Sequence, residues 1–241
     1  MATRARRGVR AWCRRGARAT LALAVVSVAG NAAAAQLRLD LVGTEGGRSA
    51  PLADAIASLH APAAPRASGA TAEIDQRNST FVPGVIGIQA GTRVSFPNTD
   101  NTLHHVYSFS PAKRFELPLY SGKRADPVLF DKSGVVTLGC NIHDWMVAHV
   151  VVLDTPWHGR TGVDGSVRLQ APPGDYVLRI WHARAAEPYE QQLTLGEDGV
   201  QRVVRVGLAP ATPMPTAGEG PSRLRALQQR LRSPQRTQPA E

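Results

Sequence analysis

Hydrophobic and polar positions alternate along the chain in short runs, and the core shows no long amphipathic helical pattern. Gly, Pro, Asn and Asp separate ten runs that are rich in Val, Leu, Ile, Thr or Phe: "QLRLDLVG", "GVIGIQ", "TRVSFPN", "HHVYSFS", "GVVTLGC", "MVAHVVVLD", "GSVRLQ", "DYVLRIWHA", "YEQQLTL" and "QRVVRVGL". Regularly spaced short strands are typical of a sandwich or a barrel. The pattern therefore predicts an all-β protein.

The first 35 residues interrupt this pattern. Seven arginines and no acidic residue precede the apolar stretch "ATLALAVVSVAG", and small residues follow it up to Ala35. This order is typical of a cleaved secretory signal, and the apolar stretch is too short to span a bilayer as a stable helix. Arg14 and Arg15 leave a twin-arginine route open. We expect an exported, periplasmic protein without a stable membrane span after residues 1–35 are removed, the alternative being an uncleaved anchor.

The leader also accounts for most of the positive charge. The whole chain has 28 basic and 19 acidic residues and a net charge of +9. Because the leader holds seven of the basic residues and none of the acidic ones, the remaining 206 residues are close to +2. The charge gives no reason to expect nucleic-acid binding, which needs a basic face on the folded domain.

The number and positions of the cysteines give the first clear indication of the chemistry. The chain has two cysteines, Cys13 in the leader and Cys140 in the core, so the exported protein cannot form an internal disulfide. A single thiol in an oxidising compartment is a liability unless it pairs with another chain, is deeply buried or binds a metal.

Three soft or borderline metal donors lie close together around this thiol. Cys140, His143 and Met146 are separated by two residues each and lie between two predicted strands, so the loop can turn around one ion. His104 and His105 begin another predicted strand and offer a fourth donor. One thiolate, two imidazoles and a weak thioether form the blue-copper ligand set, so we expect one mononuclear copper ion.

Other interpretations of these residues fit the sequence less well than copper. Structural zinc usually takes several thiolates and does not take Met, and a Cys–His nucleophile lacks an accompanying oxyanion hole or substrate motif. A buried Cys beside an incidental His and Met is the structural alternative. The remaining histidines lack close spacing to other donors and carry no predicted site: His60, His149, His158 and His182.

Residues 72–154 resemble a cupredoxin of the plastocyanin/amicyanin type, which is a Greek-key β-sandwich. The stretches that carry the resemblance are "FVPGVIGIQAGTRVSFPNTD", "LHHVYSF" and "GVVTLGCNIHDWM". The wider string "HHVYSFSPAKRFELPLYSG" resembles exported bacterial proteins of the methylamine-utilisation type. The resemblance implies a type 1 copper site with four ligands: His104, Cys140, His143 and Met146.

The residue after the first ligand departs from the family pattern. It is commonly Asn or Asp, which helps to tie the ligand loops together, but here it is His105. Strand alternation lets only one of two adjacent side chains point inward. We expect His104 to bind and His105 to support the site or to replace His104. The resemblance also implies an electron port at the surface, formed by Ile142, His143 and Trp145.

The flanking segments resemble a second family. "LRLDLVGTEGGRSAPLADAIASLHAP" and "TGVDGSVRLQAPPGDYVLRIWHA" are similar to the two halves of a transthyretin-like, carboxypeptidase-regulatory-like β-sandwich. We expect the copper domain to be inserted into this smaller sandwich, since loops tolerate insertions when the chain ends lie close together. The expected parts are a signal peptide (1–35), first strands (36–62), a linker (63–71), a cupredoxin domain (72–154), remaining strands (155–208) and a disordered basic tail (209–241).

These resemblances imply an electron carrier and not an enzyme. It would pass single electrons between periplasmic redox proteins through one copper ion. The alternative is a non-redox copper carrier or sensor, or an interaction module that uses the cupredoxin fold as a scaffold. Met146 favours the carrier, because a pure scaffold does not need four ligands.

Overall fold

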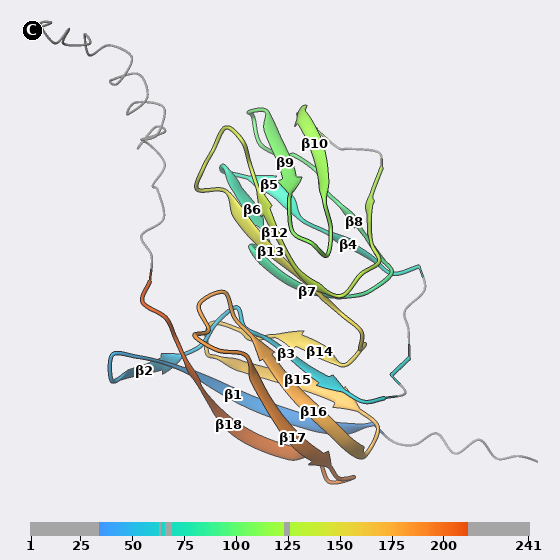
Figure 1. Cartoon of the computed structure of the whole chain (residues 1–241), viewed down its shortest axis with the longest axis vertical. Helices are drawn as coiled ribbons and strands as arrows, with labels where there is room; N and C mark the ends of the chain where they lie inside the picture. The colour runs from blue at the N-terminus through green and yellow to red at the C-terminus, as the bar shows by residue number, and fades with distance from the viewer. Residues whose placement is uncertain (1–33, 63, 66–68, 123–125, 212–241) are drawn as a thin grey trace, which may run out of the picture. The chain divides into compact units, whose positions relative to one another are not determined.

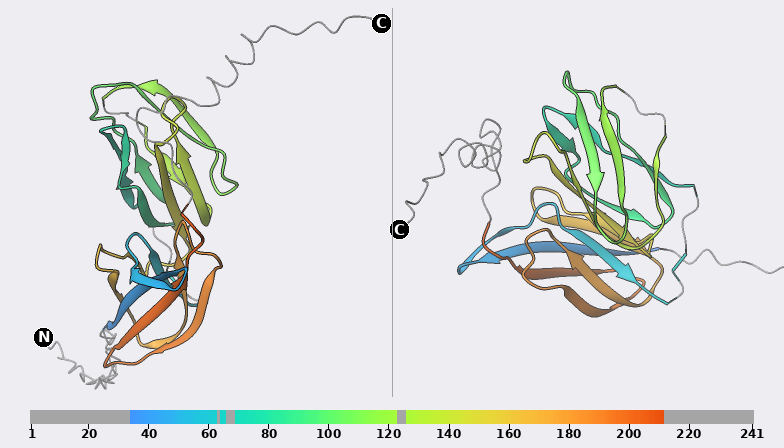
Figure 2. Two further views of the ribbon diagram at one scale, coloured as in Figure 1. Left: turned by 90° about the vertical axis from the view of Figure 1, so that its left-hand side faces the viewer. Right: turned by 45° about the horizontal axis from the view of Figure 1, so that its top comes forward.

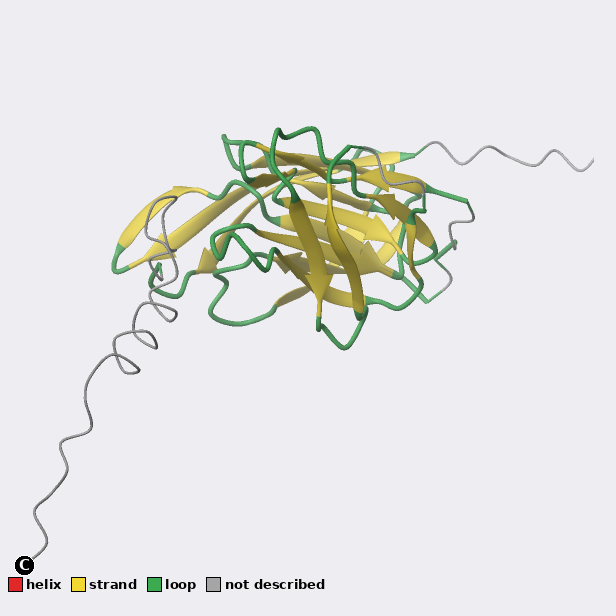
Figure 3. Cartoon of the chain, turned by 90° about the horizontal axis from the view of Figure 1, so that it is seen from above, coloured by secondary structure: helices red, strands yellow, loops and turns green. Residues whose placement is uncertain are grey.

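The described part of the chain contains strands and no helix. The structure, a computed structural model, describes residues 34–62, 64–65, 69–122 and 126–211. Eighteen strands lie in these residues (Figures 1 and 3). The prediction of an all-β protein is therefore confirmed. Within the described residues, no helix is long and apolar enough to cross a membrane.

Strands from the two ends of the described chain form one group, which we call the terminal strand group. One sheet has the order β15-β1-β18, with β2 paired to β1, and the other has the order β14-β3-β16-β17. The strand bounds are β1 Ala35–Glu45, β2 Arg48–Pro51, β3 Ile56–His60, β14 His158–Arg160, β15 Ser166–Ala171, β16 Gly174–Trp181, β17 Tyr189–Leu195 and β18 Val200–Gly207. Alternate residues of β1 enter a shared apolar core, as the sequence pattern requires: Leu37, Leu39 and Leu41.

Strand pairing within this group joins segments that are far apart in the sequence. β1 runs antiparallel to β15 and parallel to β18, and β3 pairs with both β14 and β16. Residues 35–61 and 157–208 therefore share sheets and an apolar core, which is the pairing that the insertion hypothesis requires. The predicted domain bounds stay predictions.

The turn before β15 is tightly packed against β1. Gly165 has φ of +75°, and its carbonyl accepts a hydrogen bond from the Leu41 N–H (2.9 Å). A Cβ atom at this position would contact the Leu41 carbonyl oxygen and would lie 2.9 Å from the Leu52 nitrogen. Both neighbours are backbone atoms that cannot rotate away, so this turn requires glycine.

We expect Gly165→Ala to lower the free energy of unfolding by about 2–4 kcal/mol, since it combines a left-handed conformation with a backbone clash. Gly196→Ala is the matched control, because Gly196 has no atom within 4 Å of the added Cβ and no positive φ. The control should change stability by less than about 1 kcal/mol. Urea unfolding of the two variants measures the difference, and equal losses would contradict this description of the turn.

The remaining strands form the central strand group. Its sheets have the orders β10-β9-β12-β13-β7, β11-β8-β4 and β5-β6, and the strands lie on both sides of a common core (Figure 2). The bounds are β4 Thr71–Glu73, β5 Asp75–Arg77, β6 Thr80–Val82, β7 Val85–Gln89, β8 Thr92–Ser95, β9 His104–Ser108, β10 Phe115–Tyr120, β11 Val128–Phe130, β12 Gly134–Gly139 and β13 Val147–Leu153. Phe81, Phe96 and Phe130 are the largest buried side chains of this core.

The boundaries of the predicted parts differ in detail from the observed elements. β1 already begins at Ala35, the last residue of the predicted leader, and Ala35 is buried. β4 begins at Thr71, the last residue of the predicted linker. Residues 1–33 of the leader and the tail from residue 212 onward lie outside the described residues, so the signal peptide and the basic tail stay predictions.

Candidate metal centre

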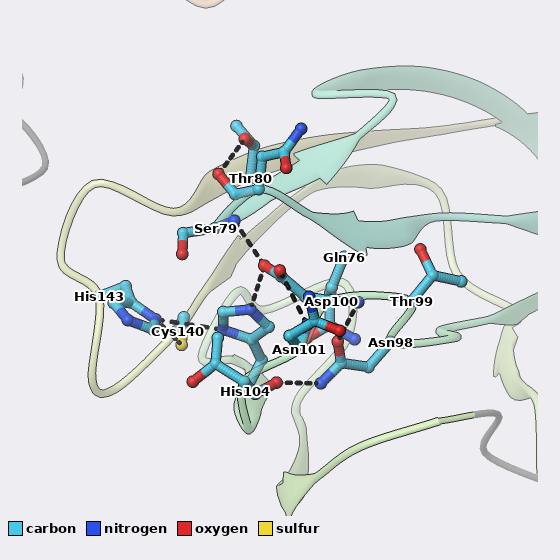
Figure 4. Close-up of polar contacts among 12 residues, drawn as sticks. Gln76, Ser79, Thr80, Asn98, Thr99, Asp100, Asn101, His104, Cys140 and His143 are labelled. Carbon is cyan, nitrogen blue, oxygen red and sulfur yellow. Dashed lines mark hydrogen bonds and ion pairs between the residues drawn. The ribbon is translucent and has the colours of Figure 1, made fainter.

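The start of β9 and the connection between β12 and β13 bring three donor side chains together. His104 is the first residue of β9, while Cys140 and His143 lie in the connection between β12 and β13. The Nδ1 atoms of His104 and His143 are 3.1 Å apart, and Cys140 Sγ lies 3.8 Å from His143 Nδ1. Figure 4 shows the three side chains converging, and their donor atoms all lie within 4.8 Å of one another.

The strands fix the depth of these donors. His104 is 0% exposed and Cys140 is 3% exposed, whereas His143 is partly exposed. β12 pairs with β13 over its whole length and with β9 at Gly139 and Tyr107, so the residue before Cys140 is anchored to the strand that begins with His104. Donors placed by paired strands need little rearrangement to meet at one point.

The electrostatic surroundings keep His143 available as a donor. Burial lowers the pKa of His143, and the neighbouring His104 lowers it further. A histidine binds a metal through a neutral ring nitrogen, so a lowered pKa favours the ligand form near neutral pH. Cys140 is a free, buried cysteine, which leaves its sulfur without a disulfide partner.

The donor set fits a soft or borderline metal ion. Bonds of about 2.0–2.1 Å to nitrogen and about 2.3 Å to sulfur are typical of such ions. The separations of 3.1 Å and 3.8 Å are shorter than the sums of two such bonds, so one ion can bridge each of these two pairs. A thiolate and two imidazoles suit copper and zinc and do not suit Mg²⁺ or Ca²⁺.

Met146 lies at the end of the same connection. Its backbone N–H donates to the His143 carbonyl (2.9 Å), which closes the turn between the two residues. Its side chain is completely buried in the core of the central strand group, next to β13. The ligand role of Met146 stays a prediction.

His105 occupies a different environment from His104. Its Nε2 atom lies 2.9 Å from Glu116 Oε1 on β10, and its ring packs against Tyr107 with centroids 5.4 Å apart. The structure thus brings His104, and not His105, to Cys140 and His143. Both histidines are buried, so the alternation of side chains along β9 separates their partners but leaves neither ring at the surface.

The residues predicted to form an electron port lie around His143. Ile142 is 48% exposed, whereas Trp145 is only partly exposed. The Trp145 ring contacts the His143 ring with centroids 5.0 Å apart, and its Nε1–H donates to the Ser79 carbonyl (3.1 Å). Trp145 therefore fixes the loop against the β5–β6 hairpin, while Ile142 offers an apolar surface beside a candidate ligand.

Sequence reasoning missed Asp100. This residue lies in the connection between β8 and β9, and its Oδ2 atom is 3.0 Å from His104 Nε2. The only signal was the polar run "NTDN" before the strand that begins with His104. An aspartate four residues before a histidine is too common to predict a contact outside a helix.

The remaining histidines lie outside this cluster. Burial lowers the pKa of each of them, which is expected for imidazoles that are partly enclosed by protein: His60, His149, His158 and His182. His149 lies 3.3 Å from the Thr137 hydroxyl and packs against Trp181. These contacts agree with a structural role for His149.

Comparison with known proteins gives only a partial likeness. No protein-family model and no curated protein matches the chain. A purple cupredoxin from Nitrosopumilus maritimus is 24% identical and covers 34% of this chain and 99% of its own, with a TM-score of 0.31. A reduced amicyanin mutant is 16% identical and covers 40% and 98%, with a TM-score of 0.33.

A third solved structure is a larger enzyme. The Cu-containing nitrite reductase (NirK) from Thermus scotoductus SA-01 is 23% identical and covers 47% of this chain and 28% of its own, with a TM-score of 0.33. All three identities are below 25% and all three TM-scores are below 0.5. These likenesses therefore carry no function over to this chain.

Proposed function

We propose that the chain is an exported copper protein that carries single electrons between redox partners. The observation that carries this proposal is the cluster of His104, Cys140 and His143, of which the first two are buried. Nitrogen and thiolate donors in this combination are those of blue-copper sites. The candidate ligands are these three residues together with Met146.

Bound copper would supply the exchange of one electron between Cu(II) and Cu(I). The protein would hold the donors in place, because two of the three are buried and all three are attached to paired strands or to the short connection between them. Donors that are held in place would move little when copper changes its oxidation state, so the reorganisation energy of electron transfer would be small. The proposed role is therefore that of a carrier and not of an enzyme.

His143 is the proposed point of electron entry and exit. It is the most exposed of the three clustered donors, and the exposed Ile142 lies beside it in the sequence. An exposed apolar side chain next to a partly exposed ligand suits the short-lived contacts of electron-transfer partners, whose interfaces are small. The proposed partners are other periplasmic redox proteins.

Met146→Leu should change the reduction potential while it leaves the fold intact. Leucine has a similar volume, so the core should lose less than about 1.5 kcal/mol, but the sulfur is removed. Loss of an axial thioether removes a donor that helps to stabilise Cu(II), so the potential should rise. Leu117→Met, a swap in the same core away from the ligand loop, is the control and should leave the potential unchanged. An unchanged potential in Met146→Leu would contradict an axial role.

The carrier function is tested by redox cycling of the copper-loaded chain. One copper per chain should bind, and repeated addition of a mild reductant and oxidant should bleach and restore the visible spectrum without loss of metal. Release of copper on reduction would favour a non-redox copper carrier instead. A chain that binds no copper would reject both copper functions.

A further inference from the structure

A carboxylate supports the buried histidine of the metal centre from the side away from the other donors. His104 Nδ1 faces His143, while His104 Nε2 lies 3.0 Å from Asp100 Oδ2 (Figure 4). An ionised carboxylate only accepts hydrogen bonds, so Nε2 must carry the proton that lies between them. This contact leaves the Nδ1 lone pair free to point at a metal ion.

Asp100 is itself held by the backbone. Its Oδ2 atom accepts a hydrogen bond from the Ser79 N–H (2.7 Å), and its Oδ1 atom accepts one from the Asn101 N–H (3.0 Å). These two backbone donors hold the carboxylate in the position where Oδ2 also meets the His104 ring. Its own N–H donates to Asn98 Oδ1 (3.0 Å), and the side chain is only 16% exposed.

Asn98 fixes the connection that carries Asp100. The Asn98 side chain is buried and donates to the carbonyls of Thr102 (2.9 Å) and Tyr120 (2.8 Å). Its backbone also exchanges two hydrogen bonds with Gly122. The loop before His104 is therefore attached to the segment around the end of β10 and cannot shift independently.

The β5–β6 hairpin contacts both the connection that precedes His104 and the connection that carries Cys140 and His143. Asn78 and Ser79 both have positive φ, and they connect the paired residues Arg77 and Thr80, which is the two-residue turn of a tight hairpin. Through this turn, the Ser79 N–H faces Asp100 while the Ser79 carbonyl accepts the Trp145 Nε1–H. Ser79 thus contacts both Asp100, which pairs with His104, and Trp145, which packs against His143.

We propose that Asp100 is a positioning residue that orients His104, fixes its tautomer and raises its strength as a ligand, with Ser79 as the anchor. Carboxylates that accept a hydrogen bond from a ligating imidazole have this effect in metal sites. In this chain Asp100 and Ser79 connect the two ligand loops, whereas His105, at the position where the resembled family commonly has Asn or Asp, faces Glu116.

The inference rests on the proposed copper function, so its test has one arm without metal. In the metal-free chain, nitrogen-edited NMR should show a slowly exchanging proton on His104 Nε2. Asp100→Asn should shift that signal and speed its exchange with water, because the acceptor loses its charge. A His104 ring protonated on Nδ1, or an Nε2 proton that is unaffected in the variant, would overturn the proposal whether or not the chain binds copper.

The second arm uses the copper-loaded chain. Asp100→Asn should weaken Cu(II) binding about 10- to 100-fold. It should also lower the preference for Cu(II) over Cu(I) about tenfold, which corresponds to a potential about 59 mV higher. Glu116→Gln is the matched control, because it removes the charge of the carboxylate that faces His105. The Cu(II) affinity and the preference for Cu(II) over Cu(I) should both stay within about twofold of the wild type. Equal effects of the two variants would overturn the proposal.

Discussion

Cys140→Ser should abolish the intense visible band of the copper-loaded protein. That band arises from charge transfer between a thiolate and Cu(II), and Cys140 is the only free cysteine in the described part of the chain. A serine hydroxyl stays protonated near neutral pH and is a much poorer ligand for copper than a thiolate. Absorption spectroscopy after addition of one equivalent of Cu(II) measures the effect, which we expect to be complete.

Two controls separate ligand loss from misfolding in this experiment. In the full-length chain, before the predicted leader is removed, Cys13→Ser makes the same chemical change and should leave the band at full strength. Thermal unfolding of metal-free Cys140→Ser should show that the β core is kept, because the substitution changes the side-chain volume little. An undiminished band in Cys140→Ser would contradict thiolate ligation.

His104→Ala and His105→Ala should differ by more than about 100-fold in Cu(II) affinity. Loss of a direct ligand costs more than loss of a supporting contact, which typically costs about 10- to 100-fold. His104 is completely buried and lies 3.1 Å from His143, so its removal leaves both a cavity and a missing donor. His105→Ala should remove contacts outside the donor cluster, with Glu116 on β10 and with the Tyr107 ring.

Competition with a chelator of known affinity measures both variants side by side. The two variants also serve as controls for each other, because they make the same truncation at adjacent positions of β9. Loss of copper affinity in His105→Ala but not in His104→Ala would contradict the assignment of His104 as the ligand. Addition of exogenous imidazole should partly restore binding in His104→Ala, since it can fill the vacated position.

The strands that sequence patterns predicted well are those with several alternating or consecutive apolar residues. β1 and β13 are examples, since each buries several residues in one core. β5 and β6 lack this signal, because they have only three residues each and surround a polar turn at Asn78 and Ser79. Their pairing depends on two positive φ angles and on contacts with distant segments, which a single sequence does not reveal.

The candidate metal centre also combines residues that local sequence spacing predicted with residues that only tertiary contacts bring in. Cys140 and His143 are three residues apart, so local spacing was sufficient to group them, and strand alternation predicted that only one of His104 and His105 points inward. Asp100 and Ser79 were not predicted, since their contact joins two turns 21 residues apart. Supporting contacts of this kind follow from the tertiary fold and leave little trace in residue spacing.

One copper ion should bind to a thiolate and two imidazoles in this chain. The paramagnetic resonance spectrum of the Cu(II)-loaded wild type, recorded together with its visible absorption, tests this directly. We expect a narrow copper hyperfine splitting and an intense visible band at one copper per chain. A colourless complex with the wide splitting of ordinary Cu(II) sites would contradict it.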